Sequence, residues 1–273
     1  MAKLKVLVTG ASGLIGGIVL KNLSHKYEFK AVNRRKVEGV PCIQADISDL
    51  EAILPAFYDV DAVLHLAAHT AGNDWEKQLS VDIGGTYNVY EASRRNGVKR
   101  VVYASSGGTM LGYENDSPYF DIVAAQYDKI PDSWPMISHE WPARPNDIVY
   151  VAKVCGETIG RYFSDQFGIS AINIRLGAVL DGDKPILRRH YPGYLSQADC
   201  VQMIDKCLSA PEAVRYDTFD AISDNRWRWR DTSHATQVLG WQPGGSAENY
   251  EIEDEGGPHQ VNKTFGFPDN QPS

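Results

Sequence analysis

The feature that most constrains the fold of this chain is a set of three glycines near its N-terminus. Gly10, Gly13 and Gly16 follow an apolar, β-branched segment over residues 3–9 and precede a helix-like segment over residues 14–25. In this arrangement the first glycine permits a tight turn, the second lets the backbone approach a pyrophosphate, and the third lets the helix pack close to a strand. The helix N-terminus then offers N–H groups and the positive end of its dipole to phosphate. A turn with a purely structural role is the alternative.

Strands and helices are expected to alternate along most of the chain. Short apolar, β-branched runs predict strands, and segments with helical periodicity lie between them. Such alternation is typical of a parallel sheet covered by helices on both faces, so the predicted fold is α/β, a doubly wound parallel Rossmann sheet. The expected strands span residues 3–9, 28–33, 41–45, 61–67, 100–104 and 170–174, and the expected helices 14–25, 48–57, 75–96, 147–167, 196–209 and 232–239.

Two segments interrupt the alternation and suggest domain boundaries. Residues 107–146 are rich in Gly, Pro and aromatic residues, which indicates either a functional loop or a loop with a small core of its own. We expect a dinucleotide-binding domain over residues 1–176, which includes this loop, and a smaller substrate-binding region over 177–243. The polar composition of residues 244–273 predicts an extended or frayed tail.

Composition argues against several classes of protein. A net charge of −8 gives the molecule no overall attraction for nucleic acid or an anionic membrane. No segment approaches the roughly 18–20 apolar residues of a membrane span, and no signal peptide is evident. The four cysteines lack the paired spacing of a zinc site. These features predict a cytoplasmic protein with a small-molecule substrate and no metal.

The end of the second expected strand distinguishes two nicotinamide cofactors. An acidic residue there would hold the ribose 2′-hydroxyl of NAD, whereas this chain has Asn33, Arg34 and Arg35. Arginine pairs with phosphate through charge-assisted hydrogen bonds, so the sequence favours NADP and leaves NAD as the alternative. A solvated basic turn without a cofactor role is the other interpretation.

Taken together, these motifs resemble the extended short-chain dehydrogenases/reductases, the NAD-dependent epimerase/dehydratase family. The resemblance covers roughly residues 3–243 and rests on segments 9–16, 65–68, 103–106 and 175–177. Within the family the chain is most similar to uronate dehydrogenase-like sugar oxidoreductases, through segments 142–145, 153–157, 223–225 and 239–243. The resemblance implies cofactor contacts from Gly10, Ser12, Gly13, Leu14, Ile15, Gly16, Asp46, Ile47, Leu66, Ala67, Ala68 and Lys153.

The resemblance also implies a catalytic Ser, Tyr and Lys, and the chain departs from that pattern at the tyrosine. Ser106 fits the Ser that hydrogen-bonds the reacting oxygen, and Lys153 fits the Lys that holds the nicotinamide ribose. The family Tyr lies four residues before the Lys, where this chain has Val149. Tyr150 lies three residues before Lys153, on an adjoining helix face, and is the candidate acid/base. Tyr113, or no group at all, is the alternative.

On the substrate side the resemblance implies contacts from Thr70, Ser106, Gly107, Tyr113 and Arg189. Arg189 lies in a basic triplet over 188–190 and resembles an Arg that holds the substrate carboxylate in uronate dehydrogenases. Exposed loop charges are the alternative.

These residues favour an enzyme, an NAD(P)-dependent oxidoreductase that transfers hydride between the cofactor and a hydroxyl or carbonyl of a sugar or sugar acid. Two other functions stay open. One is a sugar epimerase or dehydratase that uses the cofactor transiently. The other is a cofactor-binding sensor that has lost the catalytic Tyr at position 149. By analogy with relatives, the helices over 75–96 and 147–167 could form the interface of a homodimer.

Overall fold

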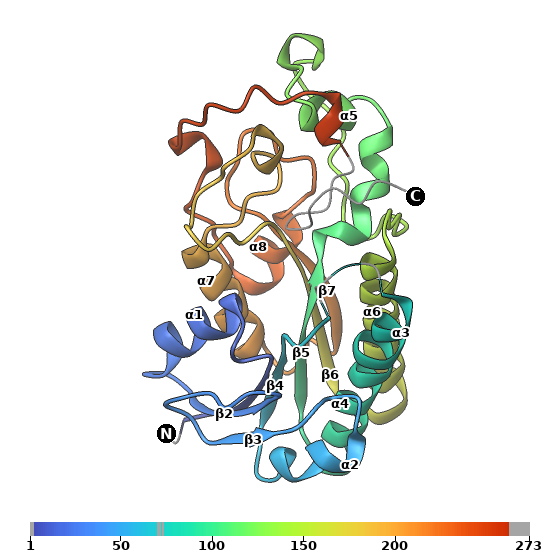
Figure 1. The fold of residues 1–273 in the computed structure, drawn as a ribbon, viewed down its shortest axis with the longest axis vertical. Coiled ribbons are helices and arrows are strands. Elements are labelled where there is room, and N and C mark those ends of the chain that lie inside the picture. Colours follow the sequence, from blue (N-terminus) through green and yellow to red (C-terminus); the bar gives the residue numbers. More distant parts are fainter. Residues whose placement is uncertain (1–2, 70–71, 73, 262–273) are drawn as a thin grey trace.

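A single parallel sheet organises the molecule. The computed structural model describes residues 3–69, 72 and 74–261, and within them seven strands pair in the order β3-β2-β1-β4-β5-β6-β7 (Figure 1). The strand order reverses between β1 and β4, and such a reversal opens a crevice beyond the carboxyl ends of these strands. The strands are β1 (Lys5–Thr9), β2 (Glu28–Asn33), β3 (Cys42–Gln44), β4 (Ala62–His65), β5 (Arg100–Ser106), β6 (Ser170–Leu176) and β7 (Tyr216–Ala221).

Helices cover both faces of this sheet, as the alternation predicts (Figure 1). Side chains alternate between the two faces of a strand, so Val6 and Val8 of β1 pack in one apolar cluster and Leu7 in the other. One face carries α1 (Leu14–Leu23), α7 (Gln197–Leu208) and α8 (Ser233–Leu239). The other face carries α2 (Leu50–Ile53), α3 (Trp75–Lys77), η2 (Gln78–Gly85), α4 (Thr86–Arg95) and α6 (Ile148–Phe167). The predicted doubly wound α/β fold is therefore confirmed.

The structure differs from the expected elements in two places. The helix expected over residues 75–96 contains a π-helical turn, η2, between α3 and α4. The sequence analysis also missed β7, because its sequence Tyr-Asp-Thr-Phe-Asp-Ala places two aspartates among the apolar residues that would mark a buried strand. The sheet thus continues past residue 176, so part of the region expected to bind substrate completes the cofactor-binding layer. The division into domains at 176 stays a prediction.

The segment 107–146 forms a small core above the carboxyl ends of the strands. It contains η3 (Gly107–Asn115), α5 (Tyr119–Val123) and η4 (Tyr127–Lys129). Its buried apolar side chains, among them Met110 and Tyr119, pack against Trp229 and against the start of α6. The interpretation as a loop with its own core is confirmed, and η3 also lines the cavity described below. The remaining short turns are η1 (Leu54–Phe57), η5 (Arg188–His190), η6 (Ala247–Asn249) and η7 (Pro258–Gln260).

The described part of the tail, residues 244–261, is extended as expected, but it is bound to the domain rather than frayed. The N–H groups of Gly244 and Gly245 donate to the Asp199 carboxylate at 2.8 and 3.0 Å. Further along, Asp254 accepts a hydrogen bond from the Arg188 N–H at 2.7 Å. This segment runs across the top of the molecule toward α5 (Figure 1). In the described part of the chain, every helix is too short or too polar to span a bilayer.

Candidate active site

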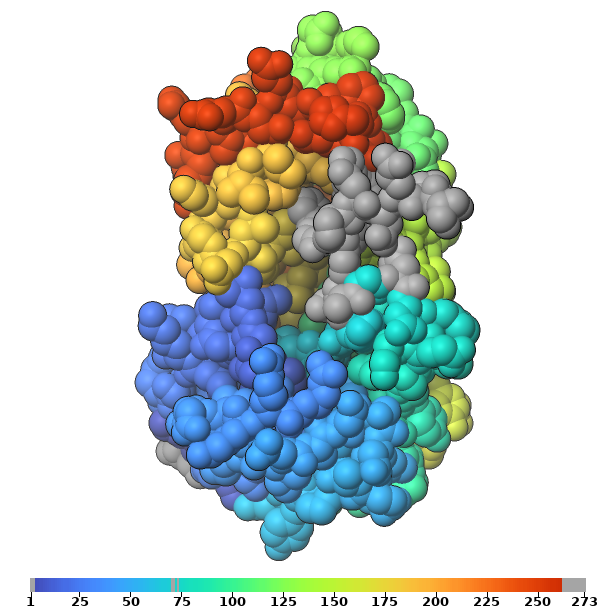
Figure 2. Space-filling model, viewed as in Figure 1, coloured from blue at the N-terminus to red at the C-terminus, as the bar shows by residue number. Residues whose placement is uncertain are grey.

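Two adjoining cavities lie at the carboxyl ends of the central strands. The first, of about 450 Å³, is lined by the glycine turn and by the end of β2. The second, of about 480 Å³, is lined by the ends of β5 and β6, by η3 and by the start of α6. Both volumes fall in the range of small-molecule sites. The surface is hollowed between the N-terminal segment and the segment after β6 (Figure 2). The cavities share the lining residues Ile15, Leu66, Ala68, Ala104 and Val179.

The three glycines of the turn have different roles. Gly10 adopts a φ of +72°, and a Cβ there would lie 2.7 Å from the backbone nitrogen of Ala67. A Cβ on Gly16 would lie 2.7 Å from the backbone of Ala11, so only glycine permits this close packing of helix on strand. At Gly13 the nearest atom to a Cβ would be the Gly10 carbonyl oxygen, at 3.3 Å. This contact is close but milder than those at Gly10 and Gly16, and the missing side chain at Gly13 opens space toward the cavity.

The N-terminus of α1 is built to receive an anion. Two other long helices are capped by side chains: Asp147 accepts the N–H of Val149 at 3.1 Å, and Ser196 accepts that of Asp199 at 3.1 Å. The capping position of α1 is Gly13, which has no side chain, so no cap covers the first N–H groups of this helix. Together with the helix dipole, this arrangement fits a pyrophosphate.

The residues expected to contact the cofactor gather around the first cavity, and the contacts themselves stay a prediction. Apart from Lys153, which lines the second, all line the first: Gly10, Ser12, Gly13, Leu14, Ile15, Gly16, Asn33, Arg34, Arg35, Asp46, Ile47, Leu66, Ala67 and Ala68. The sequence analysis missed Val32, Ala45, His69, Val81, Ala104 and Val179. Several of these are plain apolar residues at strand ends, where only the folded position carries a signal.

The polar groups at the adenine end of the first cavity hold one another in place. The side-chain amide of Asn33 donates to Ser12 Oγ at 3.1 Å and to the Arg35 carbonyl oxygen at 2.7 Å. Burial alone would raise the pKa of Asp46, but hydrogen bonds from the N–H and hydroxyl of Ser48, with Arg34 nearby, keep that pKa below its ordinary value. Asp46 is therefore an ionised hydrogen-bond acceptor at neutral pH.

The expected catalytic residues Ser106, Tyr150 and Lys153 all line the second cavity, together with Val149. The Lys153 ammonium donates to the Ala104 carbonyl oxygen at 2.8 Å. Burial lowers the pKa of Lys153, and the charge of Asp82 opposes this shift. Ser106 Oγ accepts the N–H of Gly108 at 3.0 Å. The structure brings the three residues to one cavity.

Two glycines at the start of η3 make room for larger side chains. A Cβ on Gly108 would occupy the place of the Tyr150 ring, and a Cβ on Gly107 would occupy the place of the Arg230 guanidinium. The shift of the tyrosine by one residue is thus matched by a glycine opposite its ring. No sequence pattern indicated this pairing, because the glycines and their partners lie far apart in the chain.

The expected substrate residues divide between the cavity and its surroundings. Ser106, Gly107 and Arg189 line the second cavity. Tyr113 does not, because its hydroxyl donates to the Pro142 carbonyl oxygen at 3.0 Å and its ring packs against Trp141. Contact of Tyr113 with the substrate stays a prediction. Thr70 lies outside the described residues.

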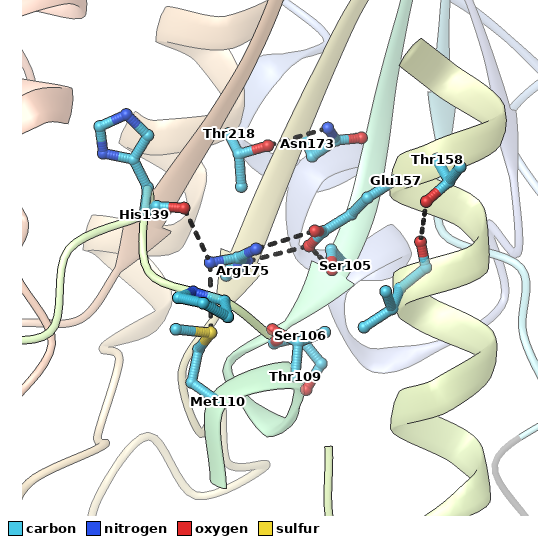
Figure 3. A network of polar contacts seen from close by, with 12 residues as sticks. Ser105, Ser106, Thr109, Met110, His139, Glu157, Thr158, Asn173, Arg175 and Thr218 are labelled. Atoms are coloured by element: carbon cyan, nitrogen blue, oxygen red, sulfur yellow. Dashed lines mark hydrogen bonds and ion pairs between the residues drawn. The ribbon is translucent and has the colours of Figure 1, made fainter. Parts of the chain in front are cut away.

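Three buried arginine–carboxylate pairs lie in or behind the lining of this cavity, and no sequence motif indicated them. Arg189 Nη1 lies 2.9 Å from Glu114 Oε2, and Arg230 Nη1 lies 2.8 Å from Asp220 Oδ1. Figure 3 shows the third pair, in which Arg175 meets both carboxylate oxygens of Glu157 at 3.0 and 2.9 Å. The Ser105 hydroxyl adds a hydrogen bond to Glu157 at 2.6 Å (Figure 3). Two of these pairs hold residues that line the cavity, and the third is linked to the lining through Ser105.

One histidine–aspartate cluster in the described part of the chain has the composition of a metal site. It comprises His139, Asp217 and His234 and lines neither cavity. The two rings stack face to face, with centroids 3.9 Å apart and planes 12° from parallel, and His234 hydrogen-bonds Asp217 at 2.8 Å. A ligating nitrogen directs its lone pair in the ring plane, so rings stacked in this way do not point at a common ion.

A parallel sheet with this strand order, an uncapped glycine turn at its switch point and an adjoining polar cavity define a Rossmann dinucleotide-binding protein. Residues 6–198 match the model of the NAD dependent epimerase/dehydratase family, and the chain belongs to that family. The family resemblance inferred from the motifs is confirmed.

Several proteins similar to this chain are sugar dehydrogenases. The chain is 29% identical to an L-arabinose 1-dehydrogenase (NAD(P)(+)) of Haloferax volcanii, over 88% of this chain and 96% of that protein. It is also 29% identical to a uronate dehydrogenase of Pseudomonas putida, over 90% of this chain and 86% of that one. Among solved structures, uronate dehydrogenase from Agrobacterium tumefaciens superimposes with a TM-score of 0.78 at 27% identity, over 99% of this chain and 92% of that one.

Proposed function

We propose that this protein is an NAD(P)-dependent oxidoreductase that transfers a hydride between the nicotinamide and a hydroxyl or carbonyl carbon of a sugar. The observation that carries the proposal is the continuity of two cavities, one built around a dinucleotide-binding turn and the other lined by Ser106, Tyr150 and Lys153. The named relatives, which are dehydrogenases of arabinose and uronates, support the same reaction class.

The bound nicotinamide supplies hydride chemistry, and the chain's own residues position the substrate and move the proton. Ser106 Oγ accepts the Gly108 N–H, so its own hydroxyl proton can point at the reacting oxygen. Lys153, anchored on the Ala104 carbonyl, places a positive charge at the cavity floor, where it can hold the nicotinamide ribose. That charge also favours the deprotonated form of a neighbouring phenol.

We assign the acid/base role to Tyr150. Val149, at the family's tyrosine position, lines the cavity but has no proton to transfer. The Tyr150 ring takes the space that Gly108 leaves and faces the same cavity. In the oxidation direction its phenolate would take the proton of the substrate hydroxyl while Ser106 holds the oxygen.

Two finer features belong to the same proposal. NADP is the preferred cofactor, with NAD as the alternative, because Asn33 replaces a carboxylate at the end of β2 and Arg34 and Arg35 line the cavity there. The active form is a cytoplasmic homodimer. Exposed apolar side chains gather on the neighbouring helices α4 and α6, where Tyr87 is 46% and Tyr162 50% exposed. Sedimentation of the wild type and of Tyr162→Glu tests this, and a monomeric wild type would contradict the dimer.

A cofactor-binding sensor is the second candidate, because Val149 removes the family's acid/base. Steady-state assays with NAD and NADP on a panel of aldoses and sugar acids separate the two. We expect net turnover, and we expect Tyr150→Phe to reduce it by about 10²–10⁴, the usual contribution of a positioned acid/base, with little change in cofactor affinity. Cofactor binding without turnover, followed by gain of activity in Val149→Tyr, would instead support the sensor.

A further inference from the structure

Both arginines that line the second cavity are already paired with a carboxylate within the protein. Arg189 and Arg230 both reach this cavity, as does the carboxylate Glu114. Arg189 is paired with Glu114 at 2.9 Å, and their side chains are only 2% and 3% exposed. Arg230 is paired with Asp220 at 2.8 Å, and these side chains are 5% and 1% exposed. Each arginine that could attract an anion therefore has a buried carboxylate against it.

An anionic substrate would be unfavourable in this cavity, which already contains the carboxylate of Glu114. Burying a carboxylate or phosphate is costly unless a cation or several N–H donors compensate the lost hydration. Glu114 already neutralises the charge of Arg189 through its contact with Nη1, and its own charge faces the same cavity and repels an incoming anion. The remaining lining cation, Lys153, lies at the floor, where it donates to Ala104.

We infer that the substrate is a neutral aldose rather than a sugar acid or sugar phosphate, and that Glu114 is the residue that determines this specificity. The inference rests on the proposed function. A carboxylate accepts hydrogen bonds, so it matches the hydroxyl donors of a neutral sugar and not the acceptor oxygens of an anion. Leu111 and Trp229, which also line the cavity, offer apolar surfaces to the C–H groups of a sugar ring.

The wild-type enzyme tests the inference with pairs of sugars that differ only in charge. D-galactose is compared with D-galacturonate, and D-glucose with D-glucose 6-phosphate, each with NAD and with NADP. We expect kcat/KM to be at least 10²-fold higher for the neutral member of the pair that is turned over. Equal values of kcat/KM, or a preference for the anion, would overturn the inference but would still support the proposed oxidoreductase activity. Absence of turnover with all four sugars would contradict the proposed function, and the inference would fall with it.

A matched pair of variants then tests the role of Glu114. Glu114→Gln keeps the shape of the side chain and removes its charge, so the galacturonate-to-galactose ratio of kcat/KM should rise at least tenfold. Glu140→Gln removes the same charge from an exposed position outside the cavity and should leave the ratio unchanged. An unchanged ratio in a folded Glu114→Gln protein would show that Glu114 does not set specificity. If that variant does not fold, the wild-type comparison still decides the substrate class.

Discussion

The cofactor half of the active site, around the first cavity, and the substrate half, around the second, are formed by different kinds of groups. The cofactor half is made mainly of backbone: a glycine turn of seven residues and the uncapped N-terminus of α1. The substrate half depends on buried side-chain pairs whose partners lie 75, 18 and 10 residues apart. Two of these pairs contribute lining residues, and the third supports Ser105 of the lining. Backbone sites of this kind depend on local conformation, whereas the paired charges depend on the tertiary fold being complete. Substitutions in the substrate half should therefore lower stability, whereas substitutions in the cofactor half should lower cofactor affinity.

The largest effect is expected where a buried pair is broken. Glu157→Ala would leave the Arg175 guanidinium, which is 6% exposed, without its carboxylate, and should lower the free energy of unfolding by about 3–5 kcal/mol. Urea denaturation measures this. The control is Glu51→Ala, which breaks an exposed pair with Arg95 and should cost under about 1 kcal/mol. Similar losses in the two variants would mean that the buried network is not a stabilising feature of the substrate half.

The cofactor half should instead lose binding while it keeps its stability. Gly13→Val places branched carbon in the space beside the helix N-terminus, so affinity for NADP should fall at least 10²-fold, or about 3 kcal/mol. Because the nearest atom to a Cβ is 3.3 Å away, the variant should remain folded. Gly17→Val adds the same side chain where nothing lies within 4 Å and serves as the control. Calorimetric titration measures the cofactor affinity, and circular dichroism shows whether the variant is folded. A folded Gly13→Val variant that still binds NADP would show that the turn has only a structural role.

A fall in pH should lower the free energy of unfolding through His190, which follows Arg189 of the substrate half. Burial, with Arg189 beside it, lowers the pKa of His190 to about 4, against about 6.5 in the unfolded chain. Between these values the unfolded state binds a proton that the folded state does not, so stability falls as pH falls. The expected contribution of His190 alone to the loss from pH 7 to 5 is about 2 kcal/mol.

The variant His190→Asn isolates this contribution. An asparagine oxygen can replace Nδ1 as the acceptor of the Ile186 N–H, which lies 3.2 Å away, without taking up a proton. The difference in unfolding free energy between pH 7 and 5 should shrink in His190→Asn and stay the same in His25→Asn, at an exposed position. An identical pH dependence in all three proteins would remove His190 as the cause.

The same contrast between the two halves explains which features of the structure could be predicted from the sequence. The glycine turn and the strand end at Asn33 are local patterns, so the fold and the lining of the first cavity could be predicted. Glu114 and Arg230 lie in irregular segments, where a charged residue has the pattern of a solvated loop until its partner is known. The strand β7 was not predicted for a similar reason. Its sequence contains Asp217 and Asp220, and the burial of Asp220 depends on its pairing with Arg230. Tyr113 packs against Trp141 and is not part of the cavity lining, and hydrophobicity alone gives no direction to a side chain in a loop.

The smallest expected effect concerns the cofactor's 2′-phosphate, which would be bound by side chains rather than by backbone groups. Arg34 and Arg35 line the first cavity but are exposed, so solvent weakens any pairing they make with phosphate. Arg34→Ala should therefore reduce NADP affinity by only about 1 kcal/mol, near the lower limit for a hydrogen bond to a charged group, and leave NAD affinity unchanged. Lys36→Ala is the matched control, because Lys36 is equally exposed, pairs with Glu38 at 3.1 Å and does not line the cavity. The NADP effect should also shrink as salt is added, since exposed charges are screened. Calorimetric titration of both cofactors decides the matter: wild-type protein that binds NAD as tightly as NADP, or an Arg34→Ala variant that loses both equally, would show that the basic strand end does not select the cofactor.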